Sequence, residues 1–213
     1  MKQINGLGIP ETLADLADPS RMALLVYDMQ VGVVRQIADG ERVTAAVAKV
    51  LDAARAAGIR VAFTRHTSLP TAWMGVTQYR MAMAWQRTDD PAAVQPWFLR
   101  GNPAVLEVLE LTPRDDEAVF DKLAMSAFEG TPLAFALRDA GITAVAIVGV
   151  AMEIGIEPTT RHAADLGFIP VIVEDAIGWG HEEAARRSFD GLRFAGDAMF
   201  TTVEELTTLF GRG

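Results

Sequence analysis

The sequence contains no cysteine, and this absence excludes several kinds of covalent and metal site. With no thiol among its 213 residues, the chain can form no disulfide framework, no thiolate zinc site and no thiol nucleophile. Only three histidines are present, so a metal site would have to rely on carboxylates. We therefore predict no metal and no other cofactor. The lack of cysteine also fits a reducing compartment.

Basic residues and long apolar runs are scarce as well. The 28 acidic and 19 basic residues give a formal net charge of −9, and no Lys/Arg cluster interrupts it. Such a charge repels phosphate backbones and anionic lipid, so we expect no nucleic acid and no membrane as partners. No apolar run approaches the ~20 residues needed to cross a bilayer, and residues 1–6 lack the charged-then-apolar pattern of a secretion signal. We expect a cytoplasmic protein that acts on a small-molecule substrate.

Half of the residues are hydrophobic, and apolar runs of strand length alternate with segments of helical period. This alternation is typical of βα units around a mostly parallel sheet. We predict an α/β chain of one domain, residues 1–213, with a three-layer Rossmann-like fold in which helices cover both faces of a roughly six-stranded sheet. The predicted strands are residues 22–27, 60–64, 118–121, 144–148 and 169–173, with a short one near Met199. The predicted helices are residues 41–57, 132–141, 158–166, 182–194 and 203–210.

Residues 70–113 interrupt this alternation. The segment holds three of the four tryptophans and two stretches rich in acids and proline. We interpret it as an insertion that serves as a lid or a subunit interface, and its first part, residues 70–87, has the length of a helix over the ligand edge of the sheet. Its aromatic and methionine side chains suit the wall of an apolar pocket, although such groups more often form core or subunit contacts.

Asp28 directly follows the apolar run of residues 22–27. The carboxyl end of a parallel strand faces the usual ligand crevice, where burial and a neighbouring charge can adjust a carboxyl group for proton transfer. The alternative is a helix N-cap, a position that Asp often occupies.

Lys122 likewise follows a predicted strand and precedes residues 126–131, which are rich in hydrogen-bond donors. Both strand ends should open onto the same edge of the sheet, so Asp28 is the candidate partner for a buried Lys122. The alternative is a surface lysine whose stem lies along the protein. A third segment, residues 148–167, turns from strand into helix. Its backbone N–H groups suit an oxyanion cradle, unless the turn is an ordinary loop in which Gly155 allows tight packing.

Together, these segments resemble the isochorismatase-like hydrolase superfamily, which includes cysteine hydrolases of the nicotinamidase and N-carbamoylsarcosine amidase type. The resemblance covers most of the chain and rests on the order and spacing of short motifs. These are Leu25-Val26-Tyr27-Asp28-Met29-Gln30, Lys122 with Ser126-Ala127-Phe128, Gly130-Thr131-Pro132-Leu133, Gly149-Val150-Ala151, Glu157 with Thr159, Arg161-His162-Ala163, Leu166-Gly167-Phe168 and Glu174-Asp175-Ala176. The resemblance implies the family's fold and a homodimer or homotetramer.

In the amidases of this family an Asp, a Lys and a Cys form the catalytic set, and the Cys attacks an amide carbonyl. Asp28 and Lys122 match two of these positions, but Gly155 occupies the third, which excludes covalent catalysis by that route. Isochorismatases proper also carry glycine there and hydrolyse a vinyl ether with the Asp as general acid. By this resemblance Asp28 would protonate the enol ether carbon and water would attack the oxocarbenium ion. Lys122 would hold both Asp28 and a substrate carboxylate.

The resemblance also suggests a substrate-binding set. After the second strand the chain has Thr64-Arg65-His66-Thr67 in place of the Gln-Pro turn expected of an isochorismatase. The predicted substrate-binding residues are Gln30, Arg65, His66, Arg80, Trp85, Ala151, Met152 and Gly155. His66 could instead protonate a leaving group or have no chemical role. We assign His162 and His181 to structure, and the zinc pattern of the nicotinamidases is absent.

Three hypotheses follow. The leading one is a hydrolase of isochorismatase type that acts on a small carboxylated substrate. The second is an amide or ester hydrolase in which Asp28 activates water, with Glu153 and Glu157 as further carboxylates. The third is a catalytically silent binding or assembly module. Retention of both Asp28 and Lys122 counts against silence, because a buried ion pair often stabilises a fold less than an apolar replacement.

Overall fold

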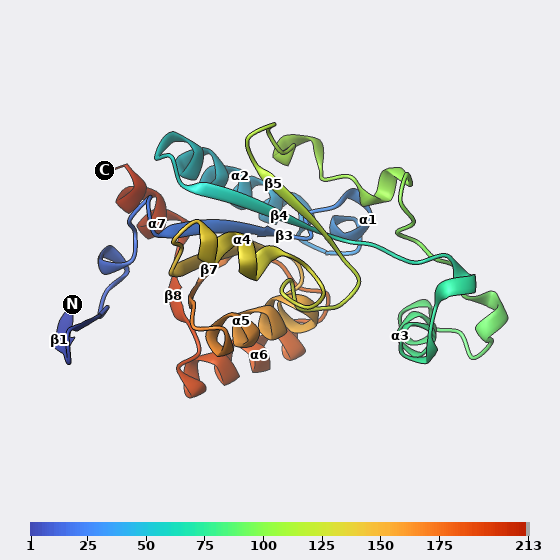
Figure 1. The fold of residues 1–213 in the computed structure, drawn as a ribbon. Helices are drawn as coiled ribbons and strands as arrows, with labels where there is room; N and C mark the ends of the chain where they lie inside the picture. The colour runs from blue at the N-terminus through green and yellow to red at the C-terminus, as the bar shows by residue number, and fades with distance from the viewer. Residues whose placement is uncertain (212–213) are drawn as a thin grey trace.

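Six apolar segments of the sequence form one parallel sheet (Figure 1). The structure, a computed structural model, describes residues 1–211. The strands are β3 (Met22–Tyr27), β4 (Arg60–His66), β5 (Ala118–Lys122), β6 (Ala144–Gly149), β7 (Ile169–Ile177) and β8 (Met199–Thr201). Their order is β5-β4-β3-β6-β7-β8, and every neighbouring pair is parallel. The predicted α/β fold with a six-stranded parallel sheet is confirmed.

Helices cover both faces of this sheet (Figure 1). One face packs against α1 (Val31–Val34), α2 (Gly40–Ala56) and α7 (Val203–Phe210). The other face packs against α4 (Leu133–Asp139), α5 (Glu157–Asp165) and α6 (Glu182–Ala195). The buried apolar residues of α2 form one stripe, Val43, Val47, Val50, Leu51 and Ala54. The sheet therefore separates two apolar cores, one on each side.

The order of the strands determines where a ligand can bind. The chain runs from β3 outward through β4 to β5 and then returns to β6 on the other side of β3. Open α/β sheets bind ligands beside the carboxyl ends of their strands at such a reversal. All six residues of β3 are buried. Asp28, which follows β3 directly, therefore emerges at the reversal point.

The structure differs from the predicted elements mainly at their ends. β4 continues two residues beyond the predicted strand because His66 still pairs with Lys122 of β5. A π-helical turn, η6 (Met152–Ile156), precedes α5. The N-terminal hairpin of β1 (Lys2–Ile4) and β2 (Leu7–Ile9) was not predicted. Its residues are all exposed, so no alternation of buried and exposed side chains marks these strands in the sequence.

Residues 70–113 form an irregular excursion between β4 and β5. It contains α3 (Val76–Gln86) and the short turns η2 (Thr71–Trp73), η3 (Pro91–Ala93), η4 (Pro103–Val105) and η5 (Leu109–Leu111). α3 has no buried residue and stands apart from the sheet (Figure 1). The role of this segment as a lid or interface stays a prediction.

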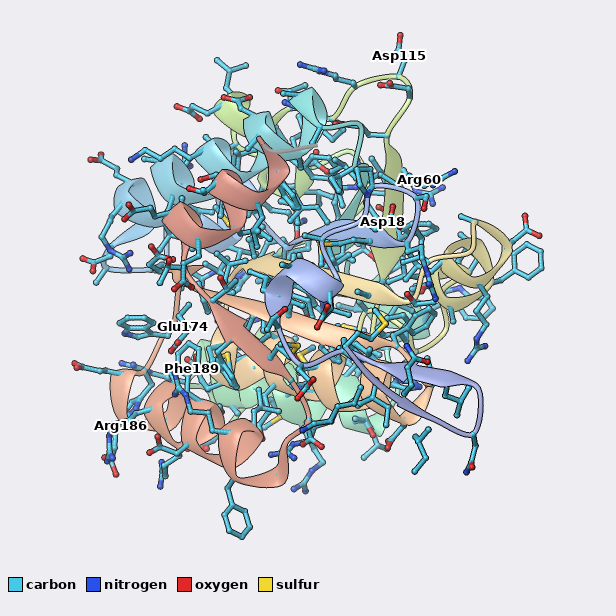
Figure 2. The ribbon with its side chains drawn as sticks, turned by 90° about the vertical axis from the view of Figure 1, so that its left-hand side faces the viewer. Asp18, Arg60, Asp115, Glu174, Arg186 and Phe189 are labelled. Atoms are coloured by element: carbon cyan, nitrogen blue, oxygen red, sulfur yellow. The ribbon has the colours of Figure 1, made fainter. Side chains whose placement is uncertain are left out.

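Apart from Asp28 and Lys122, the charged residues that the structure describes are at least partly exposed. Figure 2 shows Asp115, in the loop before β5, and Arg186, on α6, pointing outward from opposite sides, with the sheet between them. Among residues 1–211, no helix is long and apolar enough to cross a membrane. Exposed apolar side chains interrupt this polar surface in the excursion, such as Trp73 and Val76, and on α6, where Phe194 is exposed.

Candidate active site

Asp28 and Lys122 form a buried ion pair at the carboxyl edge of the sheet. Lys122 Nζ lies 2.8 Å from Asp28 Oδ2. Between them, from β4, the Thr64 hydroxyl donates a 2.7 Å hydrogen bond to Asp28 Oδ1. Asp28, Lys122 and Thr64 are only 6%, 2% and 1% exposed. The pairing expected from the strand order is therefore present, and Thr64 is a third member that the sequence reasoning missed.

The Lys122 ammonium is enclosed by protein groups, and Asp28 is the more exposed member of the pair. Besides Asp28, the ammonium donates to the Ala124 carbonyl oxygen at 3.2 Å and lies 4.5 Å from the ring centroid of Tyr27. The Lys122 side chain is fully covered, whereas 8% of the Asp28 side chain is accessible. The carboxylate is thus the more accessible member of the pair. The Lys122 ammonium binds it from the buried side.

Gly155, in η6, lies against the hydroxyl end of the Tyr27 ring. A Cβ atom added at Gly155 would overlap the Tyr27 hydroxyl oxygen and lie 2.5 Å from the ring carbon Cζ. Real Cβ atoms do not approach other atoms this closely, so no side chain fits at position 155 while Tyr27 is in place. Of the two interpretations that the sequence allowed for this turn, tight packing at Gly155 is the one observed.

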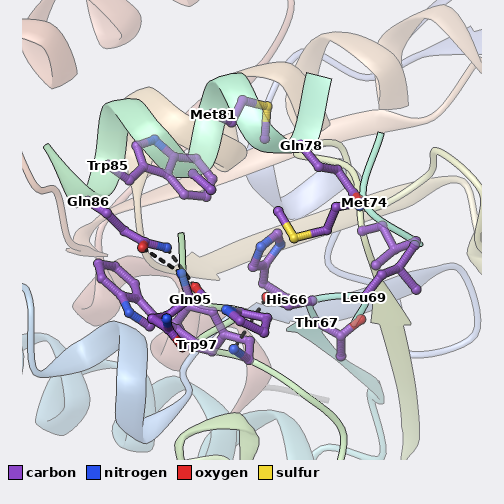
Figure 3. A pocket seen from close by; sticks show the side chains of 15 residues that line it. His66, Thr67, Leu69, Met74, Gln78, Met81, Trp85, Gln86, Gln95 and Trp97 are labelled. Atoms are coloured by element: carbon purple, nitrogen blue, oxygen red, sulfur yellow. Dashed lines mark hydrogen bonds between the residues drawn. The ribbon is translucent and has the colours of Figure 1, made fainter. Parts of the chain in front are cut away.

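A cavity lies between the end of β4 and α3 (Figure 3), and neither Asp28 nor Lys122 is among the residues that line it. The space in it that is open to water-sized molecules is about 50 Å³. His66, which pairs with Lys122 in the sheet, and Leu123, which follows Lys122, both line it. The rest of the wall is mainly apolar and includes Met74, Met81, Trp85, Trp97 and Phe98. Among the residues that the structure describes, no Lys, Arg, Asp or Glu lines this cavity.

His66 contributes an uncharged ring to the cavity wall. The ring packs edge-on against Trp85 and Phe98, with centroid distances of 6.0 and 5.6 Å. Burial lowers the pKa of His66 to about 4; the charge of Asp28 opposes this shift and that of Lys122 adds to it, both with smaller effects. The buried Nδ1 atom has no hydrogen-bond partner within the described chain. His66 is therefore neutral at pH 7 and offers one free ring nitrogen to a ligand.

Gln30 does not face a ligand. It is fully buried, and its amide accepts from the His66 N–H at 2.7 Å and donates to the carbonyl oxygens of His66 and Val105 at 3.0 and 2.9 Å. Its predicted role in substrate binding is replaced by a structural one. Gln30 fixes the end of β4 and so the position of His66.

Neither predicted arginine reaches the cavity. Arg65 points to the other side of β4, because successive side chains of a strand alternate between faces, and its Nε lies 2.7 Å from Asp121 Oδ1. Arg80 is exposed on α3 and does not line the cavity. From these positions neither arginine contacts a ligand in this cavity, whereas His66 and Trp85 line it, and the predicted substrate-binding set stays a prediction.

The turn before α5 does not provide the predicted oxyanion cradle at its central N–H groups. Met152 N–H donates to the Gly178 carbonyl oxygen at 3.0 Å, and Gly155 N–H donates to the Ala151 carbonyl oxygen at 3.0 Å. Met152 and Ala151 are also buried. The N–H groups of Met152 and Gly155 are thus already bonded to carbonyl oxygens, one outside the turn and one at its start.

The remaining polar residues that the sequence singled out make contacts within the fold. His162 Nδ1 is 2.9 Å from the Ser126 hydroxyl, and His181 caps α6 through a bond from Ala184 N–H at 3.2 Å. Glu157 pairs with Arg161, and Glu153 accepts from the N–H groups of residues 180 and 181. Among residues 1–211, no cluster of three or more His, Asp or Glu side chains could hold a metal ion.

The chain is similar to known proteins in both sequence and fold. A model of the isochorismatase domain matches residues 22–206. The uncharacterized isochorismatase family protein YecD of Escherichia coli O157:H7 is 35% identical over 116 residues, which are 54% of this chain and 58% of that protein. Ureidoacrylate amidohydrolase RutB of Rhizobium rhizogenes is 28% identical over 173 residues, 74% of this chain and 70% of that protein. A cysteine hydrolase from Pseudomonas syringae superposes with a TM-score of 0.77 at 22% identity, covering 92% of this chain and 94% of that one.

Proposed function

This chain belongs to the isochorismatase family, whose members are hydrolases, and on that premise we propose that it hydrolyses a small substrate without a covalent intermediate. Asp28 transfers a proton to or from the reacting groups, and water is the nucleophile. The observation that carries this proposal is the accessible Asp28 carboxylate, backed by Lys122, beside a position 155 that has no room for a nucleophilic side chain.

The leading form of the reaction is cleavage of an enol ether in a small carboxylated substrate. Asp28 gives its carboxyl proton to the terminal alkene carbon, which creates an oxocarbenium ion. Water attacks that ion and returns a proton to Asp28, and the resulting hemiketal breaks into a ketone and an alcohol. This role requires Asp28 to carry a proton when substrate is bound. Lys122 and Thr64 orient the carboxyl group for the transfer.

A second candidate, amide hydrolysis, is favoured by the cavity itself. Within the described chain no cationic side chain lines the cavity, which suits a neutral substrate better than a carboxylate. Two buried polar atoms among its lining residues, His66 Nδ1 and Gln78 Oε1, have no partner. A carboxamide supplies both donors and an acceptor for such atoms. In this reaction Asp28 acts as the base that activates water, and RutB is a relative named as an amidohydrolase.

The experiment measures two products in parallel. Purified protein is incubated with isochorismate, and pyruvate release is followed. The same preparation is incubated with a series of primary amides and ureido compounds, and ammonia release is followed. Pyruvate without ammonia supports the enol ether reaction, and ammonia alone supports the amide reaction. Release of neither product, from a protein that is shown to be folded, overturns the proposed function and leaves the silent binding module.

A further inference from the structure

Tyr27 is a polar residue at the end of an otherwise apolar strand. β3 reads Met-Ala-Leu-Leu-Val-Tyr, and Tyr27 is 1% exposed. Its aromatic ring and hydroxyl fill the space beside Gly155, where an added Cβ would overlap the hydroxyl oxygen and lie 2.7 Å from Cε1. Positions 27 and 155 therefore share one volume, and neither can gain atoms unless the other loses some.

Tyr27 also contacts the Lys122 ammonium and the loop after β5 that binds this ammonium. Its ring face lies 4.5 Å from Nζ, a cation–π distance. Its hydroxyl donates to the Met125 carbonyl oxygen, in the loop after β5. Ala124, the preceding residue of that loop, accepts the second hydrogen bond of the ammonium at 3.2 Å. A change at Tyr27 would thus alter both the ring beneath Lys122 and the loop that anchors it.

The environment keeps the Tyr27 hydroxyl neutral. Burial raises its pKa well above the usual value near 10, and the charge of Asp28 acts in the same direction. A neutral phenol is a hydrogen-bond donor and a poor nucleophile. Tyr27 therefore occupies the volume of a side chain at position 155 without supplying the reactivity of a thiol.

We propose that Tyr27 is a positioning residue of the active site: it closes the space at Gly155 and fixes the Lys122 ammonium against Asp28. This inference rests on the proposed function. It assigns to Tyr27 an effect on turnover although the side chain does not line the substrate cavity. It also explains why glycine is required at position 155 in this chain.

The first test needs no substrate. Thermal unfolding is measured for Gly155→Ala, Tyr27→Leu and the double variant. We expect Gly155→Ala to lower Tm by about 5 °C or more, because its methyl group overlaps Tyr27. The double variant should melt above Gly155→Ala, since the smaller leucine side chain leaves room for that methyl group. The matched control is Gly75→Ala, whose added Cβ would meet no atom within 4 Å. A double variant that melts at or below Gly155→Ala overturns the shared volume.

The second test separates positioning from a structural role. On the substrate that the product assays identify, Tyr27→Leu should lower kcat about tenfold or more and change KM less than about twofold. The reason is that Tyr27 orients Lys122 but does not bind substrate. Tyr27→Phe keeps the ring and should recover much of the loss. Tyr79→Phe, at the second of the two tyrosines, is the control. If turnover depends on Asp28 while Tyr27→Leu leaves kcat unchanged, this inference fails and the proposed function stands.

Discussion

Lys122 reaches Asp28 across an intervening strand. Nζ and Oδ2 are 2.8 Å apart, yet β4 lies between β5 and β3, so their backbones are about 10 Å apart. The long lysine side chain spans that gap, and Thr64 of β4 bonds the second carboxylate oxygen. Three adjacent strands thus each supply one polar side chain to a single buried cluster.

Breaking the buried pair from one side should destabilise the fold. Lys122→Met leaves the Asp28 carboxylate buried without its cation, so we expect the free energy of unfolding in urea to fall by about 3–5 kcal/mol. Asp28→Asn combined with Lys122→Met should recover part of this loss. The control is Arg186→Met, which removes an exposed pair with Asp190 and should change stability by less than about 1 kcal/mol. An equal effect of both single variants would contradict a buried pair.

Thr64 should matter for both stability and turnover. Thr64→Val keeps the shape but removes the hydroxyl that donates to Asp28 and accepts from its backbone N–H. We expect a loss of about 1–3 kcal/mol in unfolding free energy and a fall in kcat of about tenfold, measured by urea denaturation and steady-state kinetics. The exposed Thr208→Val is the control. Unchanged kcat in Thr64→Val would show that the carboxylate needs no orientation from β4.

His66 should make stability depend on pH in the acidic range. Its pKa is about 4 in the folded chain and near 6.5 when unfolded, so between these values the unfolded state binds more protons. The contribution of the neutral His66 ring to the free energy of unfolding is fully present above about pH 6.5. It decreases by as much as about 3 kcal/mol as the pH drops to about 4. Urea denaturation across this range should therefore give a steeper slope for the native chain than for His66→Gln. Identical slopes would contradict a buried neutral ring.

The Tyr27 hydroxyl should resist ionisation until the protein unfolds. In Tyr79→Phe, Tyr27 is the only tyrosine, so phenolate absorbance reports it alone. We expect no phenolate signal in the folded state above about pH 10, where an exposed tyrosine ionises. Because the unfolded state loses this proton first, stability should fall as the pH rises beyond 10. A smooth titration near pH 10 without unfolding would show that the hydroxyl is accessible.

The sequence predicted the sheet and the Asp28–Lys122 pair because both depend on local patterns. Apolar runs mark the buried strands, and a polar residue directly after such a run lies at the ligand edge. Thr64 was missed because one threonine in a strand carries no such signal. The positions of Arg65 and Gln30 away from the cavity could not be predicted for a different reason. Whether Arg65 or Gln30 faces a cavity depends on the face of β4 and on the path of residues 70–113, which no periodic pattern determines.

Turnover by Asp28→Asn tests the central claim most directly. The substitution keeps the shape of the side chain but removes the transferable proton, whereas Asp121→Asn changes a carboxylate that pairs with Arg65 on the other side of the sheet. On the substrate identified by the product assays, we predict that Asp28→Asn lowers kcat about 100-fold or more and that Asp121→Asn stays within a few-fold of the native rate. Turnover retained by a folded Asp28→Asn variant would contradict a reaction that runs through Asp28.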